Sequence, residues 1–309
     1  MISTLIIVFA SLFIFLIIYL FNIGFVKGEV YDVTKGKPKK GSKTAEFLND
    51  VFKGIEYINS KPHEWKYIKS IDGLTLAARF FENSSNKIIL LFHGYRSVAE
   101  NDFAGIFKYY YELGYNILLV DQRSHGRSEG KYITFGVKER FDCLKWCEYV
   151  DKNLPQIDEI ILGGISMGAT TVLLSTGLGL PDKVKGIIAD CGFTSPKDII
   201  SKVVASRYGM DAKVLLPLVN ILCKELGGFN IYECSVTDVI KENKLPILFI
   251  HGTSDDFVPS RMSKETFKAC KSRKRLVLID CVMHGVACLQ DKITVQREIK
   301  KFLVTLEKG

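Results

Sequence analysis

The sequence predicts an α/β protein: a mostly parallel sheet covered by helices on both faces, with a helical insert and one N-terminal transmembrane helix. Three observations predict it. Short β-rich apolar runs alternate with helical patterns from about residue 64 onward. One interval between two such runs exceeds fifty residues, whereas a crossover helix needs about a dozen. The stretch from Ile2 to Val26 contains no charged residue.

The charge-free stretch is long enough for a membrane span. About 25 residues at ~1.5 Å each form a helix that crosses a hydrocarbon core of ~30 Å with some tilt. A cleaved signal peptide is the alternative. No Lys or Arg precedes the run, which exceeds the usual apolar length of about 7–15 residues and lacks a small-x-small cleavage site. We therefore expect residues 1–26 to be a retained anchor.

The residues after the anchor predict its orientation. Lysines follow the apolar run and none precedes it, which favours a cytoplasmic location for the rest of the chain: Lys27, Lys35, Lys37, Lys39, Lys40 and Lys43. All the cysteines also follow the anchor, and their use fits a reducing compartment: Cys143, Cys147, Cys191, Cys223, Cys234, Cys270, Cys281 and Cys288.

Residues 27–63 are expected to form a linker of two parts. Residues 36–41 are a flexible basic tether, and residues 44–59 place apolar side chains on one helical face: Leu48, Val51, Phe52, Ile55 and Ile58. This juxtamembrane amphipathic helix either docks on the following domain or lies in the lipid interface. The net charge of +8 favours an anionic membrane surface. No nucleic-acid-binding motif accompanies it, so we expect no nucleic-acid partner.

Residues 64–309 are expected to form one domain. Residues 65–70 and 74–81 predict an antiparallel hairpin around Asp72 and Gly73. Further strands are expected at residues 87–92, 116–120, 159–163, 184–189, 246–250 and 275–279. A last amphipathic helix carries apolar residues at helical spacing: Leu289, Ile293, Ile299, Phe302, Leu303 and Leu306.

The long interval predicts a helical lid at residues 193–240. Within it, residues 214–223 are apolar nearly all round. Such a segment either lines a pocket for an acyl chain or buries itself on the domain below, and both readings stay open. Because functional loops follow the carboxyl ends of parallel strands, we expect the insert to cover the functional edge of the sheet.

The most informative motif is Gly164-Ile165-Ser166-Met167-Gly168, which follows the apolar run at residues 159–163 and opens a helical one. A serine on a sharp strand-to-helix turn needs small residues two places before and after it, and glycine fills both places. This context predicts a nucleophile elbow rather than an ordinary Gly-rich turn.

A nucleophilic serine needs a base that a carboxylate orients. Asp255 follows the expected strand at residues 246–250, and His284 follows the one at residues 275–279. Asp190 and Asp256 are alternative acids. The other histidines fit the base less well because they precede the serine or, for His251, end a buried strand: His63, His93, His125 and His251. The chain order serine, acid, base is that of one hydrolase fold.

Four motifs carry a resemblance to a known family. Beside the elbow, residues 90–95 resemble a strand ending in His-Gly that supplies an oxyanion N–H, and residues 121–130 resemble a DxRxxGxSxG loop. Residues 251–259 resemble an HGxxDxxVP segment whose first aspartate is the acid. From about Glu64 to Gly309 the chain thus resembles the α/β-hydrolase superfamily, in its serine aminopeptidase-like or esterase-lipase group. It departs from the frequent His-Ala-x-Ser at the base with His284-Gly285-Val286-Ala287.

The resemblance implies a serine hydrolase without a cofactor. Ser166 would attack a carbonyl, His284 would relay the proton, Asp255 would orient His284, and backbone N–H groups of Tyr95 and Met167 would hold the oxyanion. Carboxylic ester, thioester, lysolipid and peptide bonds all suit this machinery. An anchored site with an apolar lid favours an ester or lipid-derived acyl group over a peptide. A non-catalytic binding protein of the same fold is the alternative of another class, and the sequence does not indicate the oligomeric state.

Two further clusters have expected roles. Asp121 and Arg123 are expected to form a salt bridge beside the site rather than to contact substrate. Cys281, His284 and Cys288 match no standard zinc spacing, so we expect no metal.

Overall fold

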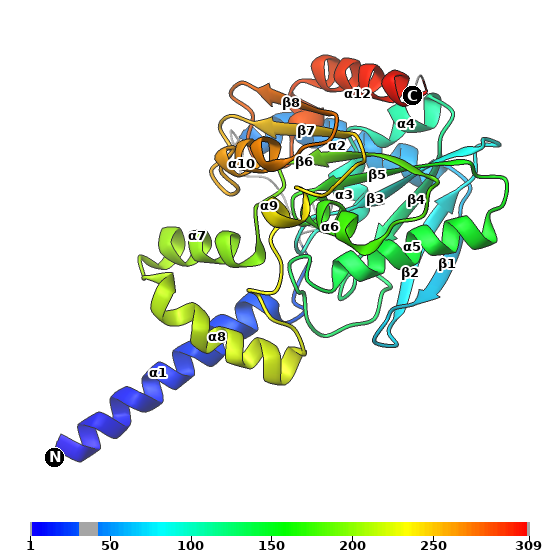
Figure 1. The fold of residues 1–309 in the computed structure, drawn as a ribbon. Helices are drawn as coiled ribbons and strands as arrows, with labels where there is room; N and C mark the ends of the chain where they lie inside the picture. The colour runs from blue at the N-terminus through cyan, green and yellow to red at the C-terminus, as the bar shows by residue number, and fades with distance from the viewer. Residues whose placement is uncertain (1, 31–42, 308–309) are drawn as a thin grey trace.

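A computed structural model describes residues 2–30 and 43–307, and its centre is one sheet of eight strands (Figure 1). The strand order is β1-β2-β4-β3-β5-β6-β7-β8. All neighbouring pairs are parallel except β1–β2 and β2–β4. The strands are β1 (Glu64–Lys69), β2 (Thr75–Phe81), β3 (Lys87–Phe92), β4 (Asn116–Asp121), β5 (Glu159–Ile165), β6 (Val184–Asp190), β7 (Ile247–Gly252) and β8 (Lys274–Ile279). The predicted α/β class is confirmed.

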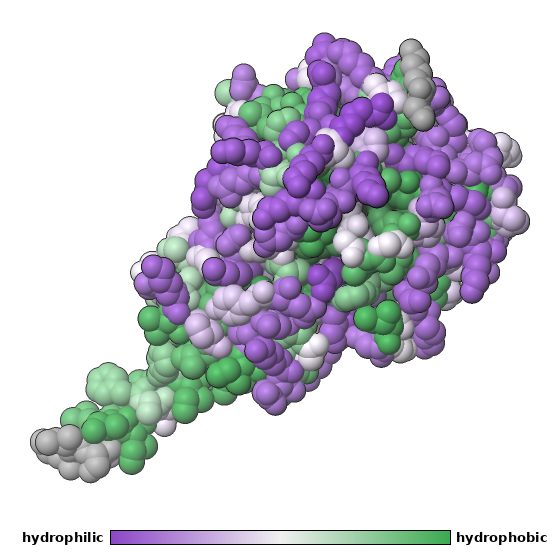
Figure 2. All heavy atoms as spheres, viewed as in Figure 1, coloured by the Kyte–Doolittle hydropathy of each residue, from purple (hydrophilic) through white to green (hydrophobic). Residues whose placement is uncertain are grey.

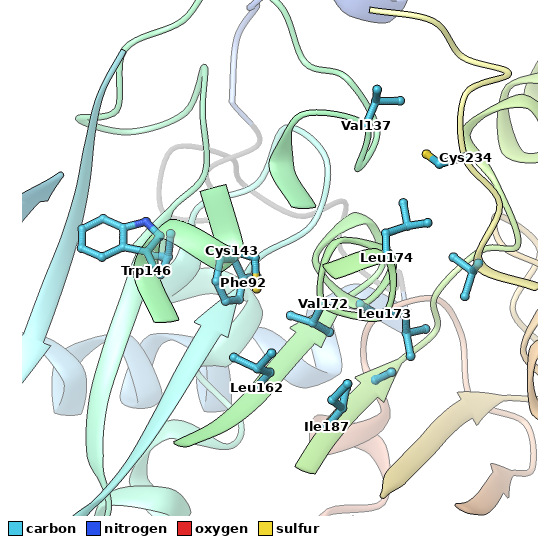
Figure 3. Packing of buried hydrophobic residues seen from close by; sticks show 14 of the residues in the cluster. Phe92, Val137, Cys143, Trp146, Leu162, Val172, Leu173, Leu174, Ile187 and Cys234 are labelled. Atoms are coloured by element: carbon cyan, nitrogen blue, oxygen red, sulfur yellow. The ribbon is translucent and has the colours of Figure 1, made fainter. Parts of the chain in front are cut away.

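Helices cover both faces because side chains alternate along each strand. Ile88 and Leu90 of β3 face one core with α5 (Glu139–Asn153) and α6 (Met167–Ser175). Ile89 and Leu91 face another core with α2 (Lys43–Ser60), α4 (Phe107–Glu112) and α12 (Lys292–Leu306). Figure 3 shows the first core, where Trp146 and Cys143 lie near Phe92. Apart from the insert between β6 and β7, the other α-helices of the domain are α3 (Ala99–Phe103), α10 (Arg261–Ala269) and α11 (Ala287–Gln290).

The predicted insert between β6 and β7 is helical. It contains α7 (Pro196–Tyr208), α8 (Ala212–Gly227) and α9 (Val236–Val239). The outer residues Val214 and Ile221 of α8, seven positions apart, are 61% and 53% exposed, while Leu215 and Val219 are buried. One face of α8 is therefore buried and the opposite face is exposed, although residues 214–223 are apolar nearly all round.

Helix α1 (Ile2–Phe25) is long and apolar enough to cross a membrane, as judged by its length and composition. It extends away from the rest of the protein, and its surface there is mostly apolar (Figure 2). Its carboxyl-terminal part is different: Leu20, Phe21 and Phe25 are buried in the protein, and α1 packs along α8. Phe25 also contacts Phe229, with ring centroids 5.6 Å apart. The carboxyl-terminal end of α1 thus belongs to the same core as the inserted helices.

Helix α2 (Lys43–Ser60) matches the expected juxtamembrane helix and docks on the domain. Leu48, Val51 and Ile58 are buried, and the helix packs against α3, α4 and α11. These contacts dock α2 on the domain, while Phe52 remains 41% exposed. The expected tether at residues 36–41 lies outside the described residues.

Candidate active site

Ser166 lies at a strained turn between β5 and α6. Its backbone has φ 55° and ψ −115°, a region that residues with side chains rarely adopt. The flanking glycines are required by contact: a Cβ at Gly164 would lie 2.3 Å from the carbonyl of Gly168, and one at Gly168 would lie 1.8 Å from the carbonyl oxygen of Phe92. The turn therefore has the tight packing that the elbow motif predicts, and the serine side chain stands at its apex.

The structure brings Ser166, His284 and Asp255 together from three separate loops. The Nε2 atom of His284 is 2.9 Å from Ser166 Oγ, and its Nδ1 is 2.7 Å from Asp255 Oδ2. When the Nδ1–H of His284 donates to the carboxylate, its Nε2 can accept a hydrogen bond from the serine hydroxyl. These contacts form an unbroken path for one proton from the serine to the imidazole.

Asp255 occupies a buried pocket built for a carboxylate. Its Oδ1 accepts the N–H groups of Phe257 and Val258 at 3.0 and 2.8 Å. Burial raises the pKa of Asp255, but hydrogen bonds from His251 and His284 outweigh it and lower the pKa to about 2. The carboxylate therefore stays ionised across the physiological range and can stabilise a charged His284.

The two alternative acids occupy different places. Asp256 is exposed, and His284 Nδ1 contacts its neighbour Asp255 instead. Asp190 ends β6, where its backbone carbonyl accepts the N–H of Ser166 at 2.8 Å. Its carboxyl is buried, and Oδ1 has no hydrogen-bond partner among the described residues. The geometry thus favours Asp255 over both alternatives.

Because Asp190 is buried, we expect its ionisation to make the free energy of unfolding depend on pH. Burial raises its pKa to about 6, above the unfolded value of about 3.9. Between these two pKa values the folded state binds more protons than the unfolded state. The free energy of unfolding therefore declines as the pH rises toward 6. We expect Asp190→Asn to raise the free energy of unfolding at pH 7.5 by up to about 3 kcal/mol, with the gain vanishing near pH 4.

Thermal melting of the solubilised protein at a series of pH values measures this effect. Asp256→Asn is the matched control, because it removes one exposed carboxyl from the same edge of the sheet. A gain at Asp190 that is the same at pH 4 and pH 7.5 would contradict ionisation as its cause.

The remaining histidines of the domain have structural contacts. His251 is fully buried, with Nδ1 2.6 Å from Ser263 Oγ and Nε2 2.8 Å from the carbonyl of Val258. His93 Nε2 accepts the N–H of Gln122, and His125 Nε2 accepts the N–H of Arg96. Burial lowers the pKa of His93 to about 4 and that of His125 to about 3, which keeps both neutral.

Two backbone N–H groups beside Ser166 are candidates to donate hydrogen bonds to a negatively charged oxygen. Met167 begins α6, so its N–H has no partner within that helix. The N–H of Tyr95 makes no hydrogen bond with another described residue, whereas its neighbour Gly94 donates to Asp102 at 2.6 Å. Ser97 Oγ also contacts Asp102, at 2.5 Å. Asp102, which sequence reasoning missed, therefore holds this loop in place.

The tyrosine side chain joins the same loop to the anchor helix. Tyr95 Oη donates to the carbonyl of Gly24 at 2.9 Å and lies 3.2 Å from that of Ile23. Arg96 Nη2 donates to the carbonyl of Val26 at 2.9 Å. The last turn of α1 is thereby attached to the residues beside the serine.

The expected Asp121–Arg123 salt bridge is wrong. Arg123 instead binds Asp142 at 2.6 Å and Asp72 at 3.0 Å. Asp121 accepts the N–H of Arg127 at 2.9 Å and packs against the turn at Gly126. Strand β4 ends at Asp121, so the chain changes direction before Arg123. The two side chains therefore contact different partners.

One group of metal-capable side chains forms within the described residues, namely Cys191, Asp255 and His284. Both nitrogens of His284 already have partners, and burial raises the pKa of the Cys191 thiol well above its usual range. This group does not fit a metal ion, because a coordinating cysteine must be a thiolate.

A cavity of about 340 Å³ opens on Ser166 and His284. Helix α2 forms one wall through Phe47, Leu48 and Val51. The sequence placed Leu48 and Val51 on an apolar helical face, but it gave no sign that they line the site, and Phe47 was not among the expected residues of that face. The volume lies within the usual range of small-molecule sites.

Comparison with known proteins supports the assignment of the fold. Residues 83–224 match a family model described as serine aminopeptidase, S33. YqkD, an uncharacterised protein of Bacillus subtilis, is 29% identical over 192 residues, which are 62% of this chain and 63% of that protein. Protein bem46 of Schizosaccharomyces pombe is 26% identical over 185 residues, 59% of this chain and 56% of that protein. The matches span less than two thirds of the length of these relatives.

Solved structures share the architecture. The Pyrococcus furiosus esterase Pf2001 superposes with a TM-score of 0.65 at 22% identity, covering 81% of this chain and 94% of that chain. Est1E from Butyrivibrio proteoclasticus, solved with ferulic acid bound, gives 0.61 at 21% identity, covering 79% of this chain and all of that chain. The sheet order and these likenesses define an α/β-hydrolase fold. Over residues 83–224 the chain is similar to the serine aminopeptidase family, and in its fold it is similar to esterases.

Proposed function

We propose that this protein is a membrane-anchored serine hydrolase that cleaves carboxylic esters, thioesters or lipid-derived acyl groups. One observation carries the proposal: a strained serine lies 2.9 Å from an imidazole whose other nitrogen lies 2.7 Å from a buried carboxylate. Removal of the proton by His284 makes Ser166 a nucleophile, and a buried, ionised Asp255 keeps the imidazole in the required tautomer.

The reaction proceeds in two halves. Ser166 Oγ attacks the acyl carbonyl while His284 Nε2 takes its proton, and the N–H groups of Tyr95 and Met167 stabilise the oxyanion. His284 then gives that proton to the leaving alcohol or thiol, which leaves an acyl-serine. Water repeats the sequence on the acyl-serine, with His284 again as base, and releases the carboxylic acid and free Ser166. No cofactor enters either half.

Labelling of the purified protein with a fluorophosphonate, together with hydrolysis of p-nitrophenyl esters, tests the proposal. Fluorophosphonates label serines that are activated in this way, so we expect stoichiometric labelling and ester turnover. Absence of both would favour the non-catalytic binding protein. The family model described as serine aminopeptidase favours one rival activity, a peptidase. Faster cleavage of aminoacyl amides than of every ester would establish that rival.

We also propose that α1 retains the protein in the membrane, with the catalytic domain on the cytoplasmic side. The lysines that follow α1 support this orientation. Cys281 is the exposed cysteine among the eight. In intact cells we therefore expect a membrane-impermeant maleimide to leave the protein unmodified, and after lysis to modify it once.

Cys281→Ser is the control for this labelling, since it should remain unmodified in both conditions. Modification of the unaltered protein before lysis would reverse the orientation. Recovery of a soluble protein beginning near Lys27 would show that α1 is a cleaved signal.

A further inference from the structure

A second cavity, of about 370 Å³, lies between the anchor and the lid. Leu20, Ile23 and Gly24 of α1 form one wall. Val203 of α7 and Leu215 of α8 belong to the opposite walls. Arg96 and Arg207 are the charged residues that line it, and no acidic side chain does so in the described part of the chain. The cavity is therefore an apolar space of the size that binds small ligands.

This cavity adjoins the candidate active site. Tyr95 and Phe257 line both the 370 Å³ cavity and the 340 Å³ cavity that contains Ser166. The Phe257 ring lies 5.1 Å from that of His284 and is 39% exposed on the loop after β7. A chain attached to a carbonyl at Ser166 can thus reach the apolar cavity by displacing one partly exposed ring.

The length of α1 determines where the membrane would meet this cavity. The candidate span Thr4–Phe25 is about as long as the ~30 Å of a hydrocarbon core. In its last turns Leu20, Phe21 and Phe25 are buried in the protein, where α1 packs along α8. An α1 that spans the membrane with this segment therefore draws the base of the inserted helices into the lipid interface. The exposed Val214 and Ile221 of α8 and the cavity residue Tyr19 suit that environment.

We infer that the cavity between α1, α7 and α8 is the acyl-chain site of the enzyme, and that it accepts long-chain acyl esters or thioesters directly from the bilayer that holds α1. The inference rests on the proposed hydrolase function. It assigns to the anchor helix a role in substrate binding besides attachment. Each methylene buried there increases affinity roughly fourfold, so chain-length preference reports occupancy of the cavity.

Gly24→Trp tests the inference. A Cβ at Gly24 meets nothing within 4 Å, so the indole can enter the cavity without displacing backbone. We expect kcat/KM for p-nitrophenyl dodecanoate to fall at least tenfold while that for the acetate changes less than twofold. Ile18→Trp is the matched control, because Ile18 lies on the same helix, is 44% exposed and does not line the cavity. It should leave both rates unchanged.

Val203→Phe fills the cavity from the opposite wall and guards against a folding defect in the first variant. The inference is overturned if both filling variants lower the two rates equally, or leave the preference for dodecanoate intact. These outcomes presuppose a Ser166-dependent acetate rate in the unaltered protein. Lack of that rate, and of fluorophosphonate labelling, would refute the hydrolase function itself.

Discussion

Ser166→Ala is expected to abolish fluorophosphonate labelling and to lower ester turnover by roughly 10⁴-fold or more. The substitution removes the Oγ that lies 2.9 Å from His284, and no hydroxyl can then form the acyl intermediate. The residual rate would come from the oxyanion donors and from substrate binding. Alanine retains a Cβ and fits the turn, although its backbone must still adopt a positive φ.

Mass spectrometry of the labelled peptide measures this result directly. The melting temperature of Ser166→Ala should stay close to that of the unaltered protein, which separates loss of chemistry from loss of fold. Ser124, which is buried elsewhere and also has a positive φ, offers a control substitution to alanine that should retain labelling. Undiminished labelling of the Ser166 variant would show that another residue is the nucleophile.

Asp255→Asn is expected to lower kcat by roughly 10³–10⁴-fold. An amide at this position can donate to His284 Nδ1, which favours the tautomer whose Nε2 carries the proton and cannot accept one from Ser166. It also removes the charge that stabilises the imidazolium. The same change at Asp256 should have an effect below about twofold, because that side chain is exposed and His284 does not contact it.

The prediction also ranks three aspartates by the activity that is lost when each is changed to asparagine, with Asp255 first. Asp190→Asn should retain most activity, since its carboxyl does not contact His284 and its backbone carbonyl, which accepts the Ser166 N–H, is unchanged. Steady-state kinetics of the three variants with one ester suffices. A larger loss at Asp190 or Asp256 than at Asp255 would transfer the acid role to that residue.

The strands and the elbow were predictable because local sequence determines them. The β-rich runs of a parallel sheet are buried on both faces, so they appear as apolar segments whatever lies nearby. The expected strand at residues 159–163 differs from β5 by two residues. Gly164 and Gly168 reveal the turn because a side chain at either position would collide with backbone.

Contacts between distant segments were not predictable in this way. The apolar side chains of α1 are satisfied equally by lipid or by protein, so composition does not show that Phe21 and Phe25 are buried against the lid. Leu48 and Val51 marked one face of α2, but only the folded chain places that face over Ser166. Arg123 likewise had several acidic residues within reach, and its partners depend on the path of two loops.

The hydrogen bond between Tyr95 and the last turn of α1 limits how freely α1 can be exchanged for another helix. A foreign apolar helix of equal length would still be long and apolar enough to cross a membrane. It would reproduce neither the carbonyl that receives Tyr95 Oη nor the fit of Phe25 against Phe135, whose ring centroids are 5.5 Å apart. The apolar length of α1 is thus a generic property, whereas its final two turns are specific to this protein. Replacing α1 would preserve the apolar span and disturb the contacts beside Ser166.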